Sequence, residues 1–211
     1  MDTKKLLAVL VSAAMCGGVL AGCGNNADSS KAESKAEASS SQAEKMPETD
    51  EEWTQAMYDK AMVSYGNTSM MQNVIKKAQS GEKVTVAYLG GSITEGISAG
   101  ADGCYAKLTY DYFAQKFGTG DNVQYVNAGL SGTPSKLGIL RLDRDVLAYE
   151  PDICFIEFAV NDGTEADYQN AYESIVRTLL QKNITPVLLF SVTESDHSAQ
   201  DYMKQIGEFY H

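Results

Sequence analysis

The chain has 211 residues, with 17 Lys and Arg against 28 Asp and Glu, which gives a formal net charge of -11. This length suffices for one α/β domain with a substantial core, but not comfortably for two. The acidic balance argues against a nucleic-acid-binding protein, because phosphate binding needs clustered Lys and Arg. A hydrophobic content of 44% and a charged content of 21% are ordinary for a globular protein.

The first 22 residues have the pattern of an export signal. Lys4 and Lys5 form a positive segment, and the apolar run over residues 6–20 is too short to span a bilayer comfortably. The run ends in Leu-Ala-Gly-Cys at residues 20–23, which resembles the lipobox of bacterial lipoproteins. The resemblance implies cleavage before Cys23, lipidation of that cysteine, and anchoring of an exported domain at a membrane surface. An uncleaved N-terminal anchor is the alternative.

Residues 24–50 consist largely of Asn, Ser, Ala, Lys and Glu, with no aromatic residue. Such a segment cannot bury enough apolar surface to offset the entropy of ordering, so we expect a disordered tether that begins at the lipidated cysteine. The folded domain is then expected over residues 51–211.

Four cysteines occur in the chain, and two of them fall in the signal region. Cys16 follows a methionine that is too large for a cleavage position, which leaves Cys23 as the lipidation site. Cys104 and Cys154 could form a disulfide in an exported protein. Because Cys154 lies in an apolar strand and Cys104 at a helix start, we expect two free thiols. No further Cys or His stands at metal-ligand spacing, so we predict no metal site and no cofactor.

Apolar periodicity and turn residues predict alternating strands and helices along the domain. A buried strand begins at Val84 and stops at Gly90-Gly91, followed by a Gly-rich loop through residue 103. Helices are expected over residues 51–64, 68–80, 105–117, 135–148, 166–182 and 198–211, and further strands over 123–127, 152–160 and 187–192. This alternation predicts a doubly wound α/β sandwich with a parallel sheet.

Small or amide residues follow three of the predicted strands: Gly91-Ser92, Gly129 to Gly132, and Asn161-Asp162. Because the carboxyl ends of parallel strands meet at one edge of a sheet, these residues should converge there. Acyl transfer needs a hydroxyl that attacks and donors aimed at the developing oxyanion. Each residue alone is equally well explained as a turn or helix cap, so it is the combination that indicates chemistry.

The sequences around these residues resemble the first three blocks of the SGNH (GDSL-type) hydrolases, a family of esterases and lipases with a flavodoxin-like fold. The matching segments are Leu89-Gly90-Gly91-Ser92, Asn127-Ala128-Gly129-Leu130-Ser131-Gly132 and Phe158-Ala159-Val160-Asn161-Asp162. The resemblance implies that Ser92 is the nucleophile and gives its N–H to an oxyanion hole. It further implies that Gly132 supplies a second N–H, that Asn161 supplies its side-chain NH2, and that the substrate is a small-molecule or polysaccharide ester.

Three departures from the family pattern stand out. Gly91 replaces the Asp of Gly-Asp-Ser, and Ala159 replaces the Gly of Gly-x-Asn-Asp, but neither change removes a reacting group. The catalytic Asp-x-x-His of the family does not occur in the 211 residues, which contain only His197 and His211. His197 follows the fourth strand and is the candidate base, although the adjacent Asp196 cannot easily orient its ring. His211 is expected to be a surface or packing residue of the last helix. We therefore expect the chain to be C-terminally incomplete, which the coding sequence beyond residue 211 would test.

Glu157 lies inside an apolar strand, and a buried carboxylate without a partner is expensive. We expect Arg141 or Arg144 of the preceding helix to pair with it, in a structural role.

Two other functions are alternatives to an esterase. A Gly-rich loop after a strand also suits a phosphate or nucleotide, although no Gly-Lys-Ser/Thr follows, and the fold could serve an inactive surface binding lipoprotein. Deacetylation of a polysaccharide is the substrate hypothesis that we favour.

Overall fold

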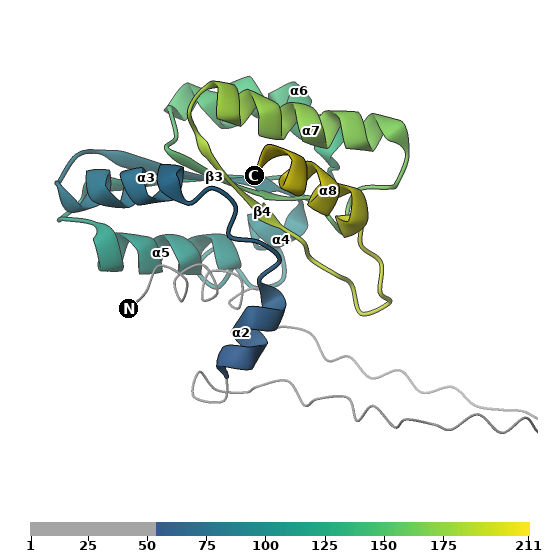
Figure 1. The fold of residues 1–211 in the computed structure, drawn as a ribbon, viewed down its shortest axis with the longest axis horizontal. Helices are drawn as coiled ribbons and strands as arrows, with labels where there is room; N and C mark the ends of the chain where they lie inside the picture. The colour runs from purple at the N-terminus through teal and green to yellow at the C-terminus, as the bar shows by residue number, and fades with distance from the viewer. Residues whose placement is uncertain (1–53) are drawn as a thin grey trace, which may run out of the picture.

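The structure is a computed structural model that describes residues 54–211 (Figure 1). The expected signal peptide, the lipidated Cys23 and the tether over residues 24–50 lie outside this range and stay predictions. Among residues 54–211, no helix is long and apolar enough to cross a bilayer.

The core of the domain is a four-stranded sheet in which all neighbouring strands run parallel, in the order β2-β1-β3-β4. This is the start of the flavodoxin-like strand order, so the predicted fold class is confirmed. The register aligns the strand ends: Gly90 of β1 lies opposite Gly129 of β2 and Glu157 of β3. The strands are β1 (Val84–Gly90), β2 (Val123–Gly129), β3 (Ile153–Glu157) and β4 (Thr185–Leu189).

Helices cover both faces of the sheet, with α3 and α5 on one face and α6, α7 and α8 on the other (Figure 1). The helices are α2 (Gln55–Ala61), α3 (Ser69–Gln79), α4 (Ser92–Glu95), α5 (Tyr105–Phe117), α6 (Ser135–Asp145), α7 (Ala166–Gln181) and α8 (Gln200–Tyr210), with a 3-10 turn η2 (Leu147–Tyr149) after α6.

The two central strands are buried on both sides, and their side chains alternate between two cores. In β1, Val86 and Tyr88 enter the core under α3 and α5, whereas Ala87 and Leu89 enter the core under α6, α7 and α8. Tyr88 stacks on Phe155 of β3, with ring centroids 4.8 Å apart. This packing fixes the direction and register of the strands whose ends carry the candidate site.

Three predicted elements differ from the structure. The short helix α4 replaces part of the expected Gly-rich loop, and α2 ends at Ala61, before the expected end at residue 64, with none of its residues buried. The last strand was predicted over residues 187–192, but β4 is Thr185–Leu189 and contains Pro186. An edge strand tolerates proline, because the side without a neighbour needs no donor, and β4 has only β3 as a partner.

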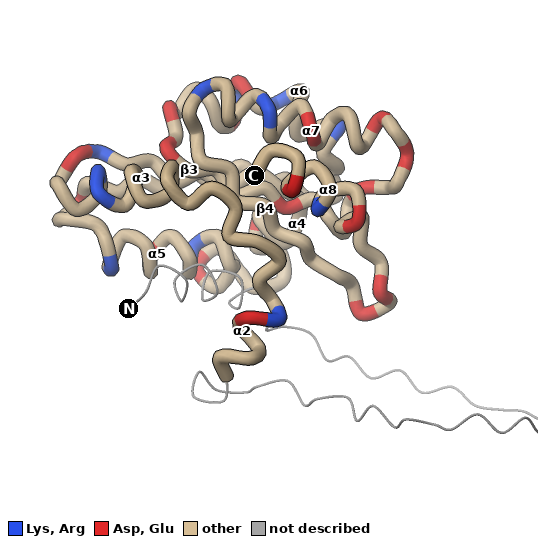
Figure 2. Tube along the Cα trace, viewed as in Figure 1, with Lys and Arg blue, Asp and Glu red and all other residues tan. Residues whose placement is uncertain are grey.

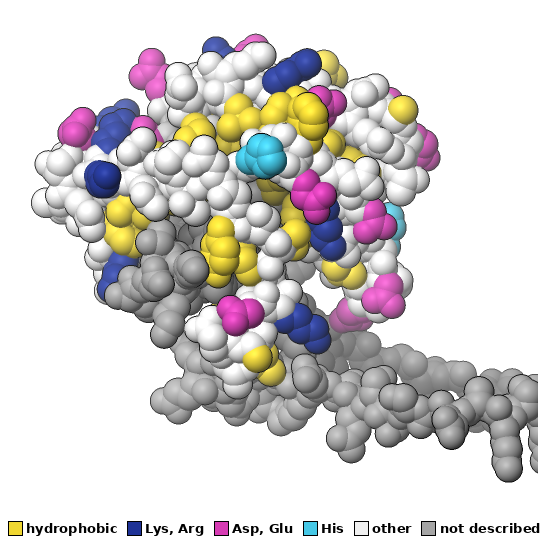
Figure 3. All heavy atoms as spheres, in the orientation of Figure 1, with side chains coloured by type: hydrophobic (Ala, Val, Ile, Leu, Met, Phe, Trp, Pro, Cys, Tyr) yellow, Lys and Arg dark blue, Asp and Glu magenta, His cyan; other side chains and the backbone are white. Residues whose placement is uncertain are grey.

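The surface is unevenly charged. Acidic residues lie on the loops that precede α7 and α8 and in the first turn of α7, where Glu165, Asp167, Glu194 and Asp196 are exposed (Figure 2). Both loops lie on the side of the sheet where the parallel strands end. Hydrophobic side chains reach the surface on the face that carries β4 and α8 (Figure 3), where Phe209 is 74% exposed.

Candidate active site

The serine predicted as nucleophile stands at the turn from β1 into α4. Ser92 is the first residue of α4 and is half-buried. Its carbonyl accepts hydrogen bonds from the N–H groups of Gly96 (2.9 Å) and Ile97 (3.2 Å), which close the short helix. Its own N–H donates to no group within residues 54–211. A first-turn N–H has no intrahelical acceptor, so this donor is free to meet a ligand.

The loop after β2 packs directly on α4. A Cβ atom at Gly129 would overlap the backbone of Glu95, so only glycine allows this approach. The N–H of Leu130 donates to the carbonyl of Gly90 at 3.0 Å, which joins the ends of β1 and β2 beyond the ladder. Gly132 is exposed, has a φ of 69° and has open space around it, and its N–H donates to no residue that the structure describes. Glycine is needed here for its backbone conformation.

Two side chains tie this loop to α4. Asn127, near the end of β2, donates its amide to the carbonyl of Thr94 at 2.8 Å and accepts the N–H of Gly129 at 2.8 Å. Glu95, the last residue of α4, accepts the N–H of Ser131 at 2.6 Å. One hydrogen bond from β2 to α4 and one from the loop to α4 therefore hold the helix that carries Ser92 against the loop that carries Gly132.

Arg141 of α6 also joins the ends of β1 and β2. Its guanidinium is only 7% exposed and donates to the carbonyls of Ala128 (2.7 Å) and Gly90 (3.1 Å). It also pairs with Asp145 one turn later, at 3.2 Å. Because hydrogen bonds from charged donors to buried acceptors are strong, Arg141 is a principal support of the site.

The third predicted block meets the first at Asn161. A Cβ atom at Gly91 would overlap Oδ1 of Asn161, so the amide lies against the residue that precedes Ser92. Oδ1 is buried without a hydrogen-bond partner, and Nδ2 donates to no residue between 54 and 211. Gly91, which has no Cβ, thus leaves room for the Asn161 side chain, and the predicted convergence of these two strand ends is present in the structure.

Asp162 fixes the third block to the second. Its buried carboxylate accepts the N–H of Ser135, at the start of α6, at 2.7 Å and the hydroxyl of Tyr202 of α8 at 2.8 Å. Burial raises the pKa of Asp162 above its usual value, and the hydrogen bonds from Ser135 and Tyr202 oppose that shift. Asp162 directly follows Asn161, and Ser135 follows Gly132 by three residues. The hydrogen bond from Ser135 to Asp162 therefore connects the segment of Asn161 with the segment of Gly132.

The expected pairing of Glu157 with Arg141 or Arg144 is wrong. The carboxylate of Glu157 is 1% exposed and accepts hydrogen bonds from Ser191, after β4, at 2.6 Å and from Thr94 of α4 at 3.5 Å. Both arginines instead pair with Asp145. Burial, with no Lys or Arg against the carboxylate among residues 54–211, raises the pKa of Glu157.

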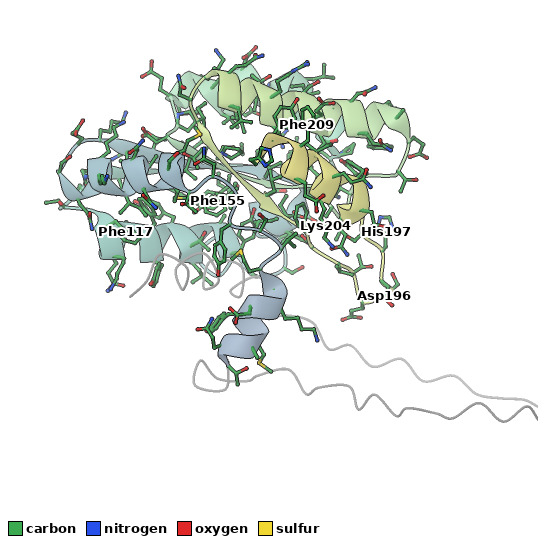
Figure 4. All side chains as sticks on the ribbon, viewed as in Figure 1. Phe117, Phe155, Asp196, His197, Lys204 and Phe209 are labelled. Carbon is green, nitrogen blue, oxygen red and sulfur yellow. The ribbon has the colours of Figure 1, made fainter. Side chains whose placement is uncertain are left out.

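His197 lies away from this cluster, on the long loop between β4 and α8, where Figure 4 shows it beside Asp196 at the outer edge of the molecule. His197 is exposed, and its ring makes no hydrogen bond with any residue that the structure describes. Its backbone is held by Thr193, whose hydroxyl accepts the N–H of His197 at 2.9 Å. The structure therefore does not join His197 to Ser92 through a hydrogen bond.

The two remaining cysteines, Cys104 and Cys154, are buried free thiols, which confirms the predicted state. Burial raises the pKa of Cys154 to about 12, so this thiol is inert in the folded protein. Within residues 54–211, no group of three or more His, Cys, Asp or Glu side chains could hold a metal ion.

Reasoning from the sequence missed the residues that support the site. Glu95, Arg141 and Asp162 were not recognised as ties between the strand ends, although Arg141 and Asp162 are charged residues within or next to apolar segments. A buried charge must find partners, and that requirement was the available signal. For Glu95, no signal existed in the sequence.

The assembled groups suit an acyl-transfer site. A hydroxyl, two free backbone N–H groups and a side-chain amide belong to three strand ends that contact one another. Donors of this kind stabilise a tetrahedral oxyanion. Two surface cavities, of about 600 and 360 Å3, are lined by none of these residues. The candidate site is therefore assigned from its polar groups and not from the size of a cavity.

Comparison with known proteins agrees with this geometry. The family model for GDSL-like lipases and acylhydrolases matches residues 88–210. A two-domain esterase active on acetylated mannans is 31% identical, with a TM-score of 0.68, over 72% of this chain and 42% of its own. The same esterase co-crystallised with mannopentaose gives 32% identity and a TM-score of 0.67, over 72% and 43% of the two chains.

A mutant of the esterase AlinE4 shares the fold at 18% identity and a TM-score of 0.50, over 62% of this chain and 74% of that one. No curated protein matches the chain. The chain spans less than half the length of the mannan esterase. The family model covers more than half of the chain's residues, and the chain therefore belongs to the GDSL-like lipase/acylhydrolase family, the SGNH hydrolases.

Proposed function

We propose that the protein is a serine esterase that removes acyl groups through an acyl-Ser92 intermediate. The observation that carries this proposal is the contact of Asn161 with Gly91, which brings the amide beside the turn that presents Ser92. The unpaired N–H groups of Ser92 and Gly132 support it, because an oxyanion hole requires donors without protein acceptors.

In this reaction the Ser92 oxygen attacks the ester carbonyl and loses its proton to a base. The oxyanion accepts hydrogen bonds from the N–H of Ser92, the N–H of Gly132 and the NH2 of Asn161. Collapse expels the alcohol, which takes up a proton, and water then releases the acid from Ser92.

We infer that the substrate is an acetylated carbohydrate. The resemblance to an esterase active on acetylated mannans, at 31% identity, supports this class. The acidic loops before α7 and α8 favour a neutral ester over an anionic one, because their charges repel phosphates and carboxylates near the strand ends. The same charges, together with an α4 of only four residues, argue against a nucleotide ligand.

We further propose that the domain is exported and anchored to a membrane through lipidated Cys23. The segment at residues 20–23 and the polar composition of residues 24–50 support this. Expression with a palmitate label should give a labelled protein in the membrane fraction. Cys23→Ser should lose the label, and a soluble protein that is never labelled would contradict the anchor.

The activity is tested on the full-length protein with three readouts: acetate release from acetylated mannan, hydrolysis of p-nitrophenyl acetate, and labelling by a fluorophosphonate. Wild type should react at Ser92, as peptide mass spectrometry would locate. Ser92→Ala should abolish all three signals. Asn161→Ala should lower kcat by about 10²–10³-fold, the usual effect of losing one oxyanion donor, while labelling at Ser92 persists at a slower rate.

Ser98→Ala is the matched control, since Ser98 is an exposed serine whose side chain makes no hydrogen bond within residues 54–211. It should retain hydrolysis and labelling. A wild-type protein that neither hydrolyses an ester nor reacts with the fluorophosphonate would contradict the esterase. Binding of acetylated mannan without turnover would then favour a surface binding protein.

A further inference from the structure

We propose that Glu95 is a positioning residue that fixes the orientation of the Gly132 N–H in the oxyanion hole. Glu95 does so from α4, the helix that carries Ser92. This inference rests on the proposed function and deepens it. Glu95 follows Ser92 by three residues in α4, and its carboxylate accepts the N–H of Ser131, the residue that directly precedes Gly132, at 2.6 Å. One side chain thus connects the attacking residue with a donor for the oxygen that the attack creates.

No other contact explains this side chain. Glu95 is half-buried and forms no ion pair with a Lys or Arg of the described range. Its hydrogen bond to Ser131 is therefore its principal interaction within residues 54–211.

The remaining ties of the loop leave the Ser131–Gly132 peptide free to turn. Leu130 is fixed by its N–H to Gly90, and Thr133 is fixed by hydrogen bonds from its N–H and hydroxyl to the carbonyl of Leu130, at 3.3 and 2.7 Å. Between these points Gly132 lies in the left-handed region, with open space where a Cβ atom would stand. A glycine peptide without neighbours has several accessible orientations. Glu95 selects the one in which Ser131 faces α4.

The experiment compares Glu95→Ala and Glu95→Gln in the full chain. A glutamine can still accept the Ser131 N–H through its amide oxygen, although less strongly than a carboxylate. Glu95→Ala should lower kcat on p-nitrophenyl acetate by about 10- to 100-fold, less than the outright loss of a donor, with KM little changed. Glu95→Gln should restore most of kcat, and labelling at Ser92 should follow the same order. Hydrogen exchange at the Ser131 amide should accelerate in Glu95→Ala only.

Glu208→Ala is the matched control, because Glu208 is an exposed glutamate of α8 with no hydrogen bond or ion pair within residues 54–211. The proposal is overturned if Glu95→Ala matches this control in kcat. It is equally overturned if Glu95→Gln is as inactive as Glu95→Ala, which would assign proton transfer to the carboxylate. If wild type itself neither hydrolyses nor labels, the esterase proposal fails. The exchange rate at Ser131 then decides alone whether Glu95 holds the loop.

Discussion

The strand ends of β1, β2 and β3 differ sharply from the end of β4. The ends of β1 and β2 are joined by the hydrogen bond from Leu130 to Gly90 and by those from Arg141 to the carbonyls of Gly90 and Ala128. The ends of β1 and β3 are joined by the close contact of Asn161 with Gly91. The loop after β4, which carries His197, is exposed over residues 194–197 and is held mainly by its own turn. The groups that would stabilise charge are therefore preorganised, whereas the group that would move the proton is not part of the same network.

This difference is instructive about what each group must do. Oxyanion donors act through fixed dipoles, and their contribution falls when they must reorient during the reaction. A general base must approach the hydroxyl closely, but its hydrogen bond is often long before substrate binds. Rigid strand ends suit the first task, and a loop at an edge strand is a poorer support for the second.

A substitution that disrupts the joined ends of β1, β2 and β3 should have the largest effect on stability. Arg141→Met keeps the aliphatic stem but removes the donors to Gly90 and Ala128, and it leaves two buried carbonyls with fewer partners. We expect a loss of about 2–4 kcal/mol in the free energy of unfolding, measured by urea denaturation. Arg144→Met is the matched control, because Arg144 pairs with the same Asp145 but is 78% exposed. It should cost less than about 1 kcal/mol. Equal losses in the two variants would refute the structural role of Arg141.

Glu157 joins the two sides, since it accepts hydrogen bonds from Thr94 of the rigid cluster and from Ser191 after β4. Its pKa is raised in the folded state by burial, with Asp162 adding to the shift. The folded state therefore binds the proton more tightly than the unfolded state does. The stability linked to this proton is fully present below the unfolded pKa of about 4.3 and is lost as the pH rises through the raised pKa.

Glu157→Gln should remove this pH dependence. Between about pH 4 and pH 7 the variant should gain stability relative to wild type, by about 1.4 kcal/mol for each unit by which the folded pKa exceeds the unfolded one. Urea denaturation of both proteins at several pH values measures the difference. A Glu157→Gln difference that does not change with pH would mean that the buried carboxyl is not protonated more readily in the fold.

The smallest effect is expected at His197. Because its ring is exposed and joined to no carboxylate within residues 54–211, His197→Asn should change kcat by less than about threefold, against the about 10²–10⁴-fold that a general base contributes. The measurement is p-nitrophenyl acetate hydrolysis across pH 5 to 9. A loss of more than tenfold would instead place His197 in the mechanism.

Much of the fold could be predicted, because alternating buried strands and amphipathic helices permit few topologies. The predicted helix over residues 105–117 coincides with α5, and the convergence of Gly91, Gly129 and Asn161 followed from the parallel sheet alone. The end of the last strand could not be predicted, since Phe190 and Val192 continue the apolar pattern past the point where pairing with β3 stops.

The contacts of charged residues were the least predictable part of the site. The partner of Glu157 depends on α4, which places Thr94 beneath the turn, and on Ser191, which lies 34 residues further along the chain. The bond from Ser131 to Glu95 depends on the conformation of a loop with two glycines. Side-chain pairing across loops is fixed by the assembled structure, whereas the strand ends are fixed by the order of elements.

The two buried thiols offer a consequence for dynamics. Cys154 lies in β3, the third strand of the four-stranded sheet order, and is fully buried, whereas Cys104 packs its sulfur against Gly96, at the end of α4, with 2% exposure. A thiol reagent reaches Cys154 only through unfolding of the sheet, but reaches Cys104 whenever the segment behind the nucleophile opens. The ratio of the two modification rates therefore separates breathing of the catalytic edge from breathing of the whole domain. The native sequence thus already contains a pair of chemical probes for the rigidity on which an oxyanion hole depends.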